Sequence, residues 1–408
     1  MSEQESIDFS IYRNCDAESY LSLWDRDLNF AENIASILPK FVVLPNAKLQ
    51  NVVAASYLCH NTVLCDVLPI LFAIGQAGSG KSTLGILASE IFSCTPINAS
   101  SSPAALRNEI MRLRFWGGDR ENPYLLIWDD IKSTNLMEYP IVYSLLRSGY
   151  NRKTDQILVA GAEGTNMSFR VFGGRVVSSI EPFFNHPKMS ELQRRTLPIA
   201  CKRFSNFTQA EATEAGITDP SWTIEDKCDL ADFDWDGLNQ SYLAFWKEEE
   251  RLQLYSVIKK KLSRSKHLKD ELGQYFTVSK DLVATAVATG ICVDLPTAVS
   301  IFAQFWHTVA AKQFSDLSAT AQVCSQVIEE LIHPIRSRNE ALGYQQFPEV
   351  VNPKELQARL KAASQNGELD SYLTPRDLGA VMASLGWKLK LLKYPSPVTG
   401  MYWIQAIE

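Results

Sequence analysis

A glycine-rich stretch in the first quarter of the chain is the feature that most constrains its fold. Residues 75–82 read GQAGSGKS, an unbroken match to the phosphate-binding pattern G-x-x-x-x-G-K-[ST]. The apolar run VLPILFAI precedes this stretch, and a helical pattern from Thr83 to Phe92 follows it. A buried strand that enters such a loop and a helix that leaves it predict a nucleotide-binding α/β core with a parallel sheet.

Each residue type in this stretch has a chemical reason to be there. The glycines let the backbone bend until successive N–H groups point at phosphate oxygens. Lys81 places a positive charge near the β and γ phosphates, and Ser82 offers a hydroxyl to Mg²⁺. We therefore expect ATP and Mg²⁺ as ligands, held by Gly75, Gln76, Ala77, Gly78, Ser79, Gly80, Lys81, Ser82 and Thr83.

Two aspartates end a second apolar run, PYLLIWDD at 123–130. In nucleotide-binding folds such a strand carries an acidic residue that holds Mg²⁺, which assigns this role to Asp129. Asp130 is expected to orient or deprotonate the attacking water. A short strand candidate at 95–99 separates the glycine stretch from this pair in the sequence. This favours the branch of ATPases in which another strand is inserted between the strand of the glycine stretch and that of the aspartate pair. It disfavours the kinase and GTPase branch.

Three later stretches resemble those of a known family: LLRSGYNRKT (145–154), FRVFGGRVVSSIEP (169–182) and ELQRRTLPIACKRF (191–204). With the glycine stretch and the aspartate pair, they look like the ASCE-type, AAA+-like P-loop ATPase domains of plasmid-, phage- and mobile-element-encoded primase-helicases. They are also similar to superfamily 3 helicases. The resemblance covers about residues 46 to 204. It implies a P-loop NTPase sheet with helical flanks, ATP hydrolysis and a homo-oligomeric, hexameric ring.

The resemblance also implies two catalytic side chains beyond the loop. A polar sensor near the end of the strand RVVSSI falls on Ser178 or Ser179, and we assign it to Ser179. An arginine that reaches the γ-phosphate of a neighbouring subunit corresponds to Arg195, with Arg194 as the alternative. Such an arginine stabilises charge that develops in the transition state.

Residues 156–172 predict two strands around AEGTN, similar to the pore hairpin of superfamily 3 helicases. The tip of this hairpin is not basic. The DNA contacts expected here are therefore Arg152, Lys153 and Arg170 at its base, with a purely structural hairpin as the alternative. The run KKKLSRSKHLK (259–269) is a second basic stretch with a helical pattern, and it fits either a solvated face or a nucleic-acid contact.

The C-terminal part of the chain predicts a winged-helix-like module. Asn352 and Pro353 open one helix, Thr374 opens a second, and two strands around a Pro/Gly turn follow in 387–405. Two helices followed by a hairpin is the order of that module. Basic side chains near its wing would contact phosphates without regard to sequence, and winged helices also dock proteins. The residues concerned are Lys388 and Lys390.

Four regions are expected along the chain. They are a helical leader (1–45), a P-loop ATPase core (46–218), a helical domain (219–348) and the winged-helix-like domain (349–408). An acid-rich stretch at 220–236 marks the boundary between the second and the third.

Composition excludes several classes of protein. The net charge of −6 is not that of a nucleic-acid coat, so any DNA contact must be local. The eight cysteines include no C-x-x-C pair and the five histidines are dispersed, which argues against a metalloenzyme. The acidic N-terminus is not a signal peptide, and no apolar run is long enough for a bilayer. We expect a cytoplasmic protein with no membrane partner.

These patterns favour a ring-forming, ATP-hydrolysing DNA helicase or translocase that acts in the replication of a mobile element or in a related DNA transaction. Its partner would be DNA, most naturally single-stranded. The alternative is a nucleotide-switched regulator or loader that binds a replication protein through its winged helix. A P-loop kinase is the least supported interpretation, because the sequence shows no arginine-bearing lid over an acceptor.

Overall fold

The computed structural model describes residues 29–76, 78–94, 96–98, 105–106, 108–109, 125–131, 136, 140–160, 166–180, 182, 187–217, 235–311, 324–332, 350–365, 378–379, 381–382, 385, 387–392 and 400–405. The chain divides into two compact units. The larger comprises residues 1–181 and 191–314, and the smaller comprises 182–190 and 315–408.

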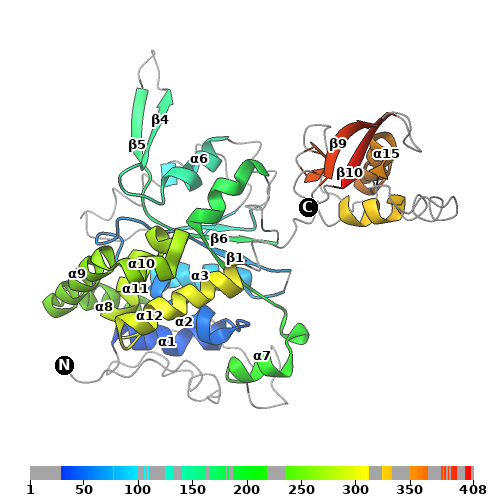
Figure 1. Ribbon diagram of the computed structural model, residues 1–408. Coiled ribbons are helices and arrows are strands. Elements are labelled where there is room, and N and C mark those ends of the chain that lie inside the picture. The colour runs from blue at the N-terminus through cyan, green and yellow to red at the C-terminus, as the bar shows by residue number, and fades with distance from the viewer. Residues whose placement is uncertain are drawn as a thin grey trace. The chain divides into compact units, whose positions relative to one another are not determined.

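A five-stranded parallel sheet forms the centre of the larger unit (Figure 1). Its strand order is β2 (Ile97–Asn98), β3 (Leu125–Asp129), β6 (Gly174–Ser179), β1 (Ile70–Ile74) and β7 (Thr196–Ala200). All neighbouring strands run parallel, with Ile70 opposite both Arg175 and Thr196. Every residue of β1 and β6 is buried, as expected of a sheet covered on both faces. The predicted α/β class with a parallel sheet is therefore confirmed.

Strand β6 separates β1 from β3 in space. Strand β2, which lies between those two in the sequence, forms the edge of the sheet beyond β3. Between β3 and β6 the chain forms α6 (Pro140–Ser148) and then an antiparallel hairpin of β4 (Gln156–Ala160) and β5 (Asn166–Arg170). This hairpin agrees with the one predicted at 156–172, and it projects away from the sheet (Figure 1).

Helix α3 (Lys81–Ile91) leaves the loop that follows β1 and packs against β1, β3 and β6. It does so because Leu84, Leu87 and Ile91 recur every three or four residues and are all buried. The other described helices of the larger unit are α1 (Phe30–Phe41), α2 (Ala47–Leu58), α7 (Gln209–Glu214), α8 (Trp235–Phe245), α9 (Glu249–Arg264), α10 (Lys266–Leu272), α11 (Phe276–Ala288) and α12 (Leu295–Phe305). Single-turn or irregular segments are η6 (Phe204–Asn206), η9 (Gly273–Tyr275) and the π-helical η10 (Trp306–Ala310), and η5 (Pro187–Arg195) precedes β7.

One hydrophobic core runs through the larger unit from Phe30 to Ala310. It includes residues of the predicted leader, the predicted ATPase core and the predicted helical domain. Helix α8 and the residue that follows it are joined to the turn after α2 by two hydrogen bonds. The Tyr242 hydroxyl donates to the carbonyl of His60 (2.8 Å), and the Trp246 indole donates to that of Cys59 (3.0 Å). The helices after residue 234 therefore share their core with the elements that lead into the sheet.

His60 makes this core sensitive to acid. Its side chain is fully buried, with Nε2 3.1 Å from the Thr62 hydroxyl and Nδ1 against the carbonyl of Tyr57. Burial lowers the pKa of His60 from 6.5 to about 4, although the hydrogen bond to Tyr57 opposes this shift. Below pH 6.5 the unfolded chain therefore binds a proton that the folded chain excludes. We expect the free energy of unfolding to fall by about 3 kcal/mol between pH 6.5 and pH 4.

Urea unfolding of the wild type and of His60→Gln across pH 7.5 to 4.5 measures this contribution. The variant is less stable throughout, but it should lose the part of the pH dependence that His60 causes. An equal slope in both proteins would assign the acid sensitivity to other groups.

The smaller unit contains a three-stranded antiparallel sheet in the order β8 (Val350–Val351), β10 (Gly400–Gln405), β9 (Trp387–Leu392). Helix α15 (Pro353–Gln365) packs against β10. The core includes Leu356 and Leu360 from that helix together with Trp387 and Trp403. The helix after Asn352 and the two later strands agree with the sequence pattern, and β8 was not predicted. Most of the second predicted helix lies outside the described residues, so the winged-helix assignment stays a prediction.

Among the residues that the structure describes, no helix combines the length and the apolar character that crossing a bilayer requires.

Candidate active site

The carboxyl ends of β1, β3 and β6 meet at one edge of the sheet, because these strands are parallel and adjacent. The glycine loop (residues 75–80, with Lys81 and Ser82 opening α3) follows β1. The pair Asp129 and Asp130 ends β3. The two serines considered as sensors end β6. The sheet therefore brings three separate sequence stretches to one place.

The backbone of the loop needs its glycines. Gly78 has φ of 76° and Gly80 has φ of 84°, a region that other residues rarely adopt. The N–H of Gly75 donates to the carbonyl of Ser179 (3.2 Å), and a side chain at Gly75 would collide with the carbonyl of Cys201. The loop is thus held against the ends of β6 and β7.

Lys81 is a buried cation without a counter-ion among the described residues. The residue is 8% exposed, and its side chain makes no hydrogen bond or ion pair with any of them. The hydroxyl of Ser79, in the same loop, is also buried and has no hydrogen-bond partner in the described part of the chain. Leaving a charge and a hydroxyl unsatisfied in this way costs free energy unless a ligand completes them. An anion with several acceptor oxygens fits both.

Ser82 and Asp129 are in direct contact. The Ser82 hydroxyl donates to Asp129 Oδ1 at 3.0 Å, across 47 residues of sequence. A hydroxyl beside a partly buried carboxylate is a pair of oxygen ligands that suits Mg²⁺ when its remaining positions are filled by water and phosphate. No group of three or more His, Cys, Asp or Glu gathers within the described ranges, and a Mg²⁺ site of this type does not need one.

Ser178 links the two aspartates. Its hydroxyl donates to Asp129 Oδ1 and accepts the backbone N–H of Asp130, the latter at 2.9 Å. Asp130 has φ of 55°, an uncommon conformation for a residue other than glycine, and its side chain is exposed. Ser178 therefore holds the turn that presents Asp130 at the edge of the sheet.

Ser179, the residue that we assigned as the sensor, lies differently. Its side chain is fully buried, and its hydroxyl donates to the carbonyl of Ile131 at 2.6 Å. Successive side chains of a strand point to opposite faces, so only one of the two serines can reach Asp129. In the structure that residue is Ser178.

Of the remaining loop residues, Gln76 is exposed, Thr83 is partly buried and Ala77 lies outside the described residues.

Arg203 was not considered from the sequence. It follows β7, whose Ala200 pairs with Ile74 at the end of β1, and its Nε lies 3.8 Å from where a Cβ on Gly78 would be. The sequence signal that could have indicated Arg203 is a basic residue shortly after β7, the strand that pairs with β1.

Arg195 lies at the other end of the sheet. It precedes Thr196, which pairs with Ile70 at the start of β1, whereas the loop follows the end of that strand. Five residues of strand separate the two positions by about 16 Å. The Arg195 guanidinium lies over the Tyr150 ring (4.7 Å to its centroid) and 3.6 Å from Glu191. Arg194, the alternative, is exposed. The structure does not bring Arg195 to its own chain's loop.

Arg152 at the base of the hairpin is used within the fold. Its guanidinium donates to the carbonyls of Thr62 and Cys65, the latter at 3.0 Å, and stacks on Phe172 at 4.4 Å from the ring centroid. These contacts tie the segment before β1 to the base of the hairpin.

The other expected DNA contacts remain open to solvent. Lys153 is exposed, and Arg170, with a side chain that is 57% exposed, lies 3.8 Å from Asp155. In the smaller unit, Lys388 and Lys390 are exposed on β9 and share one face of it, because they are two residues apart. Their role in DNA binding stays a prediction.

Comparisons with known proteins add little to this geometry. No protein-family model matches the sequence, and no curated protein matches it. Among solved structures, the chain is similar to the C-terminal region of NrS-1 in its A-form apo structure, with 12% sequence identity and a TM-score of 0.32. That similarity covers 92% of this chain and 75% of that one. A similarity of this size carries no conclusion about activity.

Proposed function

We propose that this chain is a P-loop ATPase of the ASCE branch, which hydrolyses ATP with Mg²⁺ and couples hydrolysis to movement along DNA. The contact between Ser82 and Asp129 carries the proposal. It joins the hydroxyl and the carboxylate to which the sequence pattern assigns Mg²⁺. The position of β6 between the loop strand and the aspartate strand supports the ASCE branch.

The residues of the site fit these ligands. Lys81 and the loop N–H groups would bind the phosphates. The negative charge of the phosphates would then balance the positive charge of Lys81. Ser82 and Asp129 would hold the metal ion. When bound, Mg²⁺ neutralises charge that develops on the transferred phosphoryl oxygens. Asp130 orients the attacking water, and Ser178 keeps both aspartates in place.

A hexameric ring agrees with the position of Arg195. Because Arg195 lies about 16 Å from its own loop, at the far end of the sheet, the γ-phosphate that it would contact in this proposal is that of a neighbouring copy. In such a ring the hairpin of β4 and β5 and the exposed Lys153 and Arg170 supply DNA contacts. The resemblance stated from the sequence suggests replication of a mobile element as the process.

A second function has one observation in its favour. Leu389 (44% exposed) and Leu391 (57%) lie on one face of β9, and Met401 (48%) is near that face because it pairs with Leu391. Exposed apolar side chains gathered in this way often mark a protein-binding surface. In this alternative the ATPase is a switch or loader, and the smaller unit binds a replication protein.

Steady-state ATP hydrolysis with and without single-stranded DNA tests the proposal, and two adjacent serines provide a matched pair of variants. We expect DNA to stimulate wild-type turnover several-fold. Ser178→Ala frees the Asp129 carboxylate and the Asp130 turn, and should lower turnover by about 10- to 100-fold. Ser179→Ala loses a hydrogen bond within the fold. It should cost about 1–3 kcal/mol of stability and leave turnover nearly unchanged.

Two outcomes would count against the proposal. Equal losses in both serine variants would mean that Ser178 has no special part in the site. Slow turnover that does not respond to DNA would exclude a DNA motor and favour the loader or switch.

A further inference from the structure

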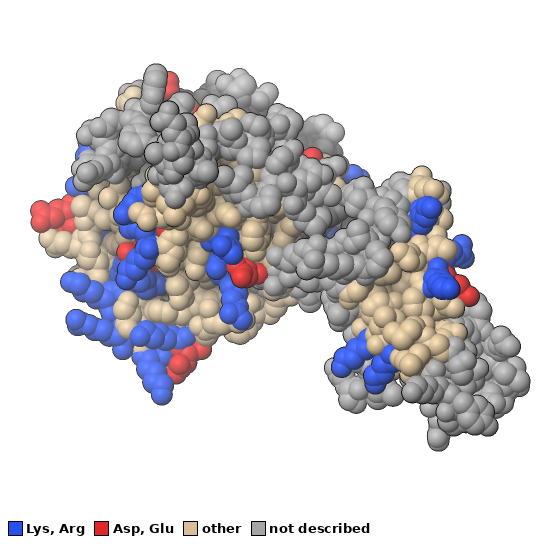
Figure 2. Space-filling view, turned by 90° about the horizontal axis from the view of Figure 1, so that it is seen from above, with Lys and Arg blue, Asp and Glu red and all other residues tan. Residues whose placement is uncertain are grey.

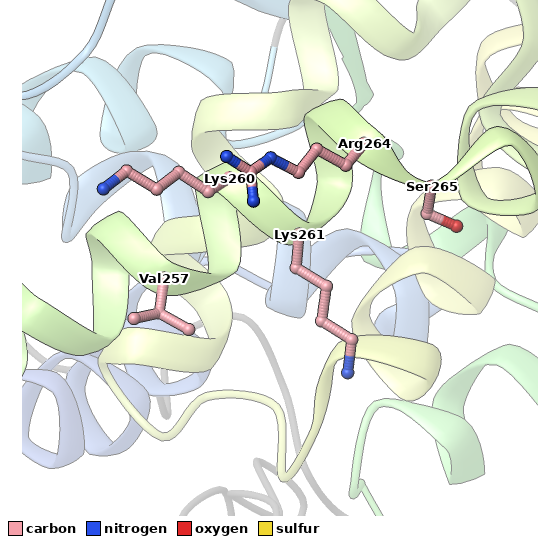
Figure 3. A pocket seen from close by; sticks show the side chains of 5 residues that line it. All are labelled: Val257, Lys260, Lys261, Arg264 and Ser265. Carbon is pink, nitrogen blue, oxygen red and sulfur yellow. The ribbon is translucent and has the colours of Figure 1, made fainter.

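A basic pocket on α9 is not used by the site described above. It has a volume of about 520 Å³ and lies along the second half of the helix and the residue that follows it (Figure 3). Its lining residues are Val257, Lys260, Lys261, Arg264 and Ser265. The pocket is thus bounded by three cations, one hydroxyl and one apolar side chain.

The first lysine of the basic run has a separate, structural role. Lys259 is 18% exposed, and its Nζ lies 2.8 Å from Asp281 and 3.0 Å from Asp66. Lys260, Lys261 and Arg264 are exposed, and none of them forms an ion pair with a carboxylate in the described part of the chain. The charge of Lys261 does lower the pKa of Asp294, after the larger effect of the hydrogen bonds from Thr297.

Gathering these three cations costs some helix stability. Lys260 and Arg264 are four residues apart and Lys261 and Arg264 are three apart, and like charges at such spacings repel. Lys261 and Arg264 gain from the dipole of the last helical turn, but Lys260 lies outside it. The chain as a whole carries a charge of −6, so composition does not account for the cluster. Lys and Arg gather on the side of the larger unit where α9 lies (Figures 1 and 2).

We propose that this pocket binds the phosphate backbone of single-stranded DNA. Lys260, Lys261 and Arg264 neutralise phosphates, Ser265 offers a hydrogen bond, and Val257, which is 58% exposed, provides apolar surface for a sugar or base. Binding of this kind is independent of sequence and sensitive to salt. The choice of DNA among polyanions rests on the proposed function.

The test is the affinity of the full-length chain for a fluorescently labelled single-stranded oligonucleotide, measured by anisotropy without ATP over 50–300 mM salt. The pocket variant combines Lys260→Gln, Lys261→Gln and Arg264→Gln. The slope of log K, the association constant, against log salt is negative. Losing three phosphate contacts should make this slope shallower by about 2, since each contact contributes about −0.7. The affinity at 100 mM salt should fall at least about tenfold.

A control variant with the same change of net charge combines Lys48→Gln, Lys247→Gln and Lys361→Gln, all at exposed positions. It should bind DNA almost as the wild type does. Equal losses in both variants, or an unchanged slope in the pocket variant, would overturn the inference. So would binding of the wild type to anionic phospholipid vesicles but not to DNA.

ATP hydrolysis separates this inference from the proposed function. If the pocket variant binds DNA normally and DNA still stimulates its ATPase, the pocket assignment fails and the proposed function stands. If the pocket variant loses DNA binding but wild-type hydrolysis ignores DNA, the pocket assignment stands and the coupling fails. A wild type that does not bind DNA overturns the pocket assignment whatever its ATPase activity.

Discussion

Lys81→Met is expected to abolish nucleotide binding and, at the same time, to make the nucleotide-free protein more stable. The wild-type Lys81 residue is 8% exposed and has no counter-ion among the described residues, so the folded state loses part of the hydration of this cation without gaining an ion pair. A methionine of similar length removes that cost, and we expect a gain of about 1 kcal/mol. The same change removes the charge that binds the β and γ phosphates, so hydrolysis should fall by at least about 100-fold.

Thermal unfolding with and without ATP and Mg²⁺ measures both effects in one experiment. ATP at 100 times its dissociation constant should stabilise the wild type by about 2.7 kcal/mol and leave Lys81→Met unaffected. Lys247→Met, at an exposed position, is the control and should respond to ATP as the wild type does. A Lys81→Met protein that keeps its response to ATP would contradict the site, and one that is less stable without ATP would contradict the unpaired lysine.

Asp281→Ala is expected to destabilise the larger unit by about 3–5 kcal/mol. The Asp281 carboxylate is fully buried in α11 and accepts the backbone N–H groups of Asp66 and Val67, both at 2.9 Å. It also accepts the Tyr255 hydroxyl (2.9 Å) and lies 2.8 Å from the Lys259 ammonium, both in α9. Removing it leaves two N–H groups without this acceptor and leaves the Lys259 cation with Asp66 as its counter-ion and with the carbonyl of Leu64. The loss should be large because the segment before β1 is held through this carboxylate.

Urea unfolding at pH 7 measures the loss, and Asp270→Ala, at an exposed position, is the control. Burial alone would lower the pKa of Lys259, but Asp281 and Asp66 raise it above 10.5. The contribution of the charged Lys259 to the free energy of unfolding is therefore lost only as the pH rises through that raised pKa. Burial would raise the pKa of Asp66, but Lys259 holds it below 3.8. The contribution of the ionised Asp66 to the free energy of unfolding is therefore lost as the pH falls through this lowered pKa. The contribution of this network to stability is therefore constant near neutrality. A loss below about 1 kcal/mol would contradict the role of Asp281.

Local patterns accounted for the elements that carry the site. The apolar run before Gly75, the helical period after it and the run that ends at Asp129 each depend on neighbouring residues. Such patterns were sufficient to predict β1, α3 and β3 and the α/β class. They were also sufficient for the β4–β5 hairpin.

Side-chain directions could not be predicted in the same way. Ser178 and Ser179 have the same chemistry and adjacent positions, and only the register of β6 between β1 and β3 decides which one faces Asp129. Arg152 shows no local sign that it contacts the carbonyls of Thr62 and Cys65. These contacts depend on residues that are distant in the sequence.

The basic run of α9 shows the same difference between what the local sequence predicts and what tertiary contacts decide. The sequence alone determined that several cations lie on one helix, because helical period and charge are local properties. Only the tertiary structure decided that Lys259 is bound to Asp66 and Asp281 while Lys260, Lys261 and Arg264 line a pocket. The sequence likewise determined a glycine loop and an aspartate pair, and the parallel sheet decided that they meet. The physical reason is that backbone conformation follows from neighbouring residues, whereas the partners of a side chain are set by which distant segments pack against it.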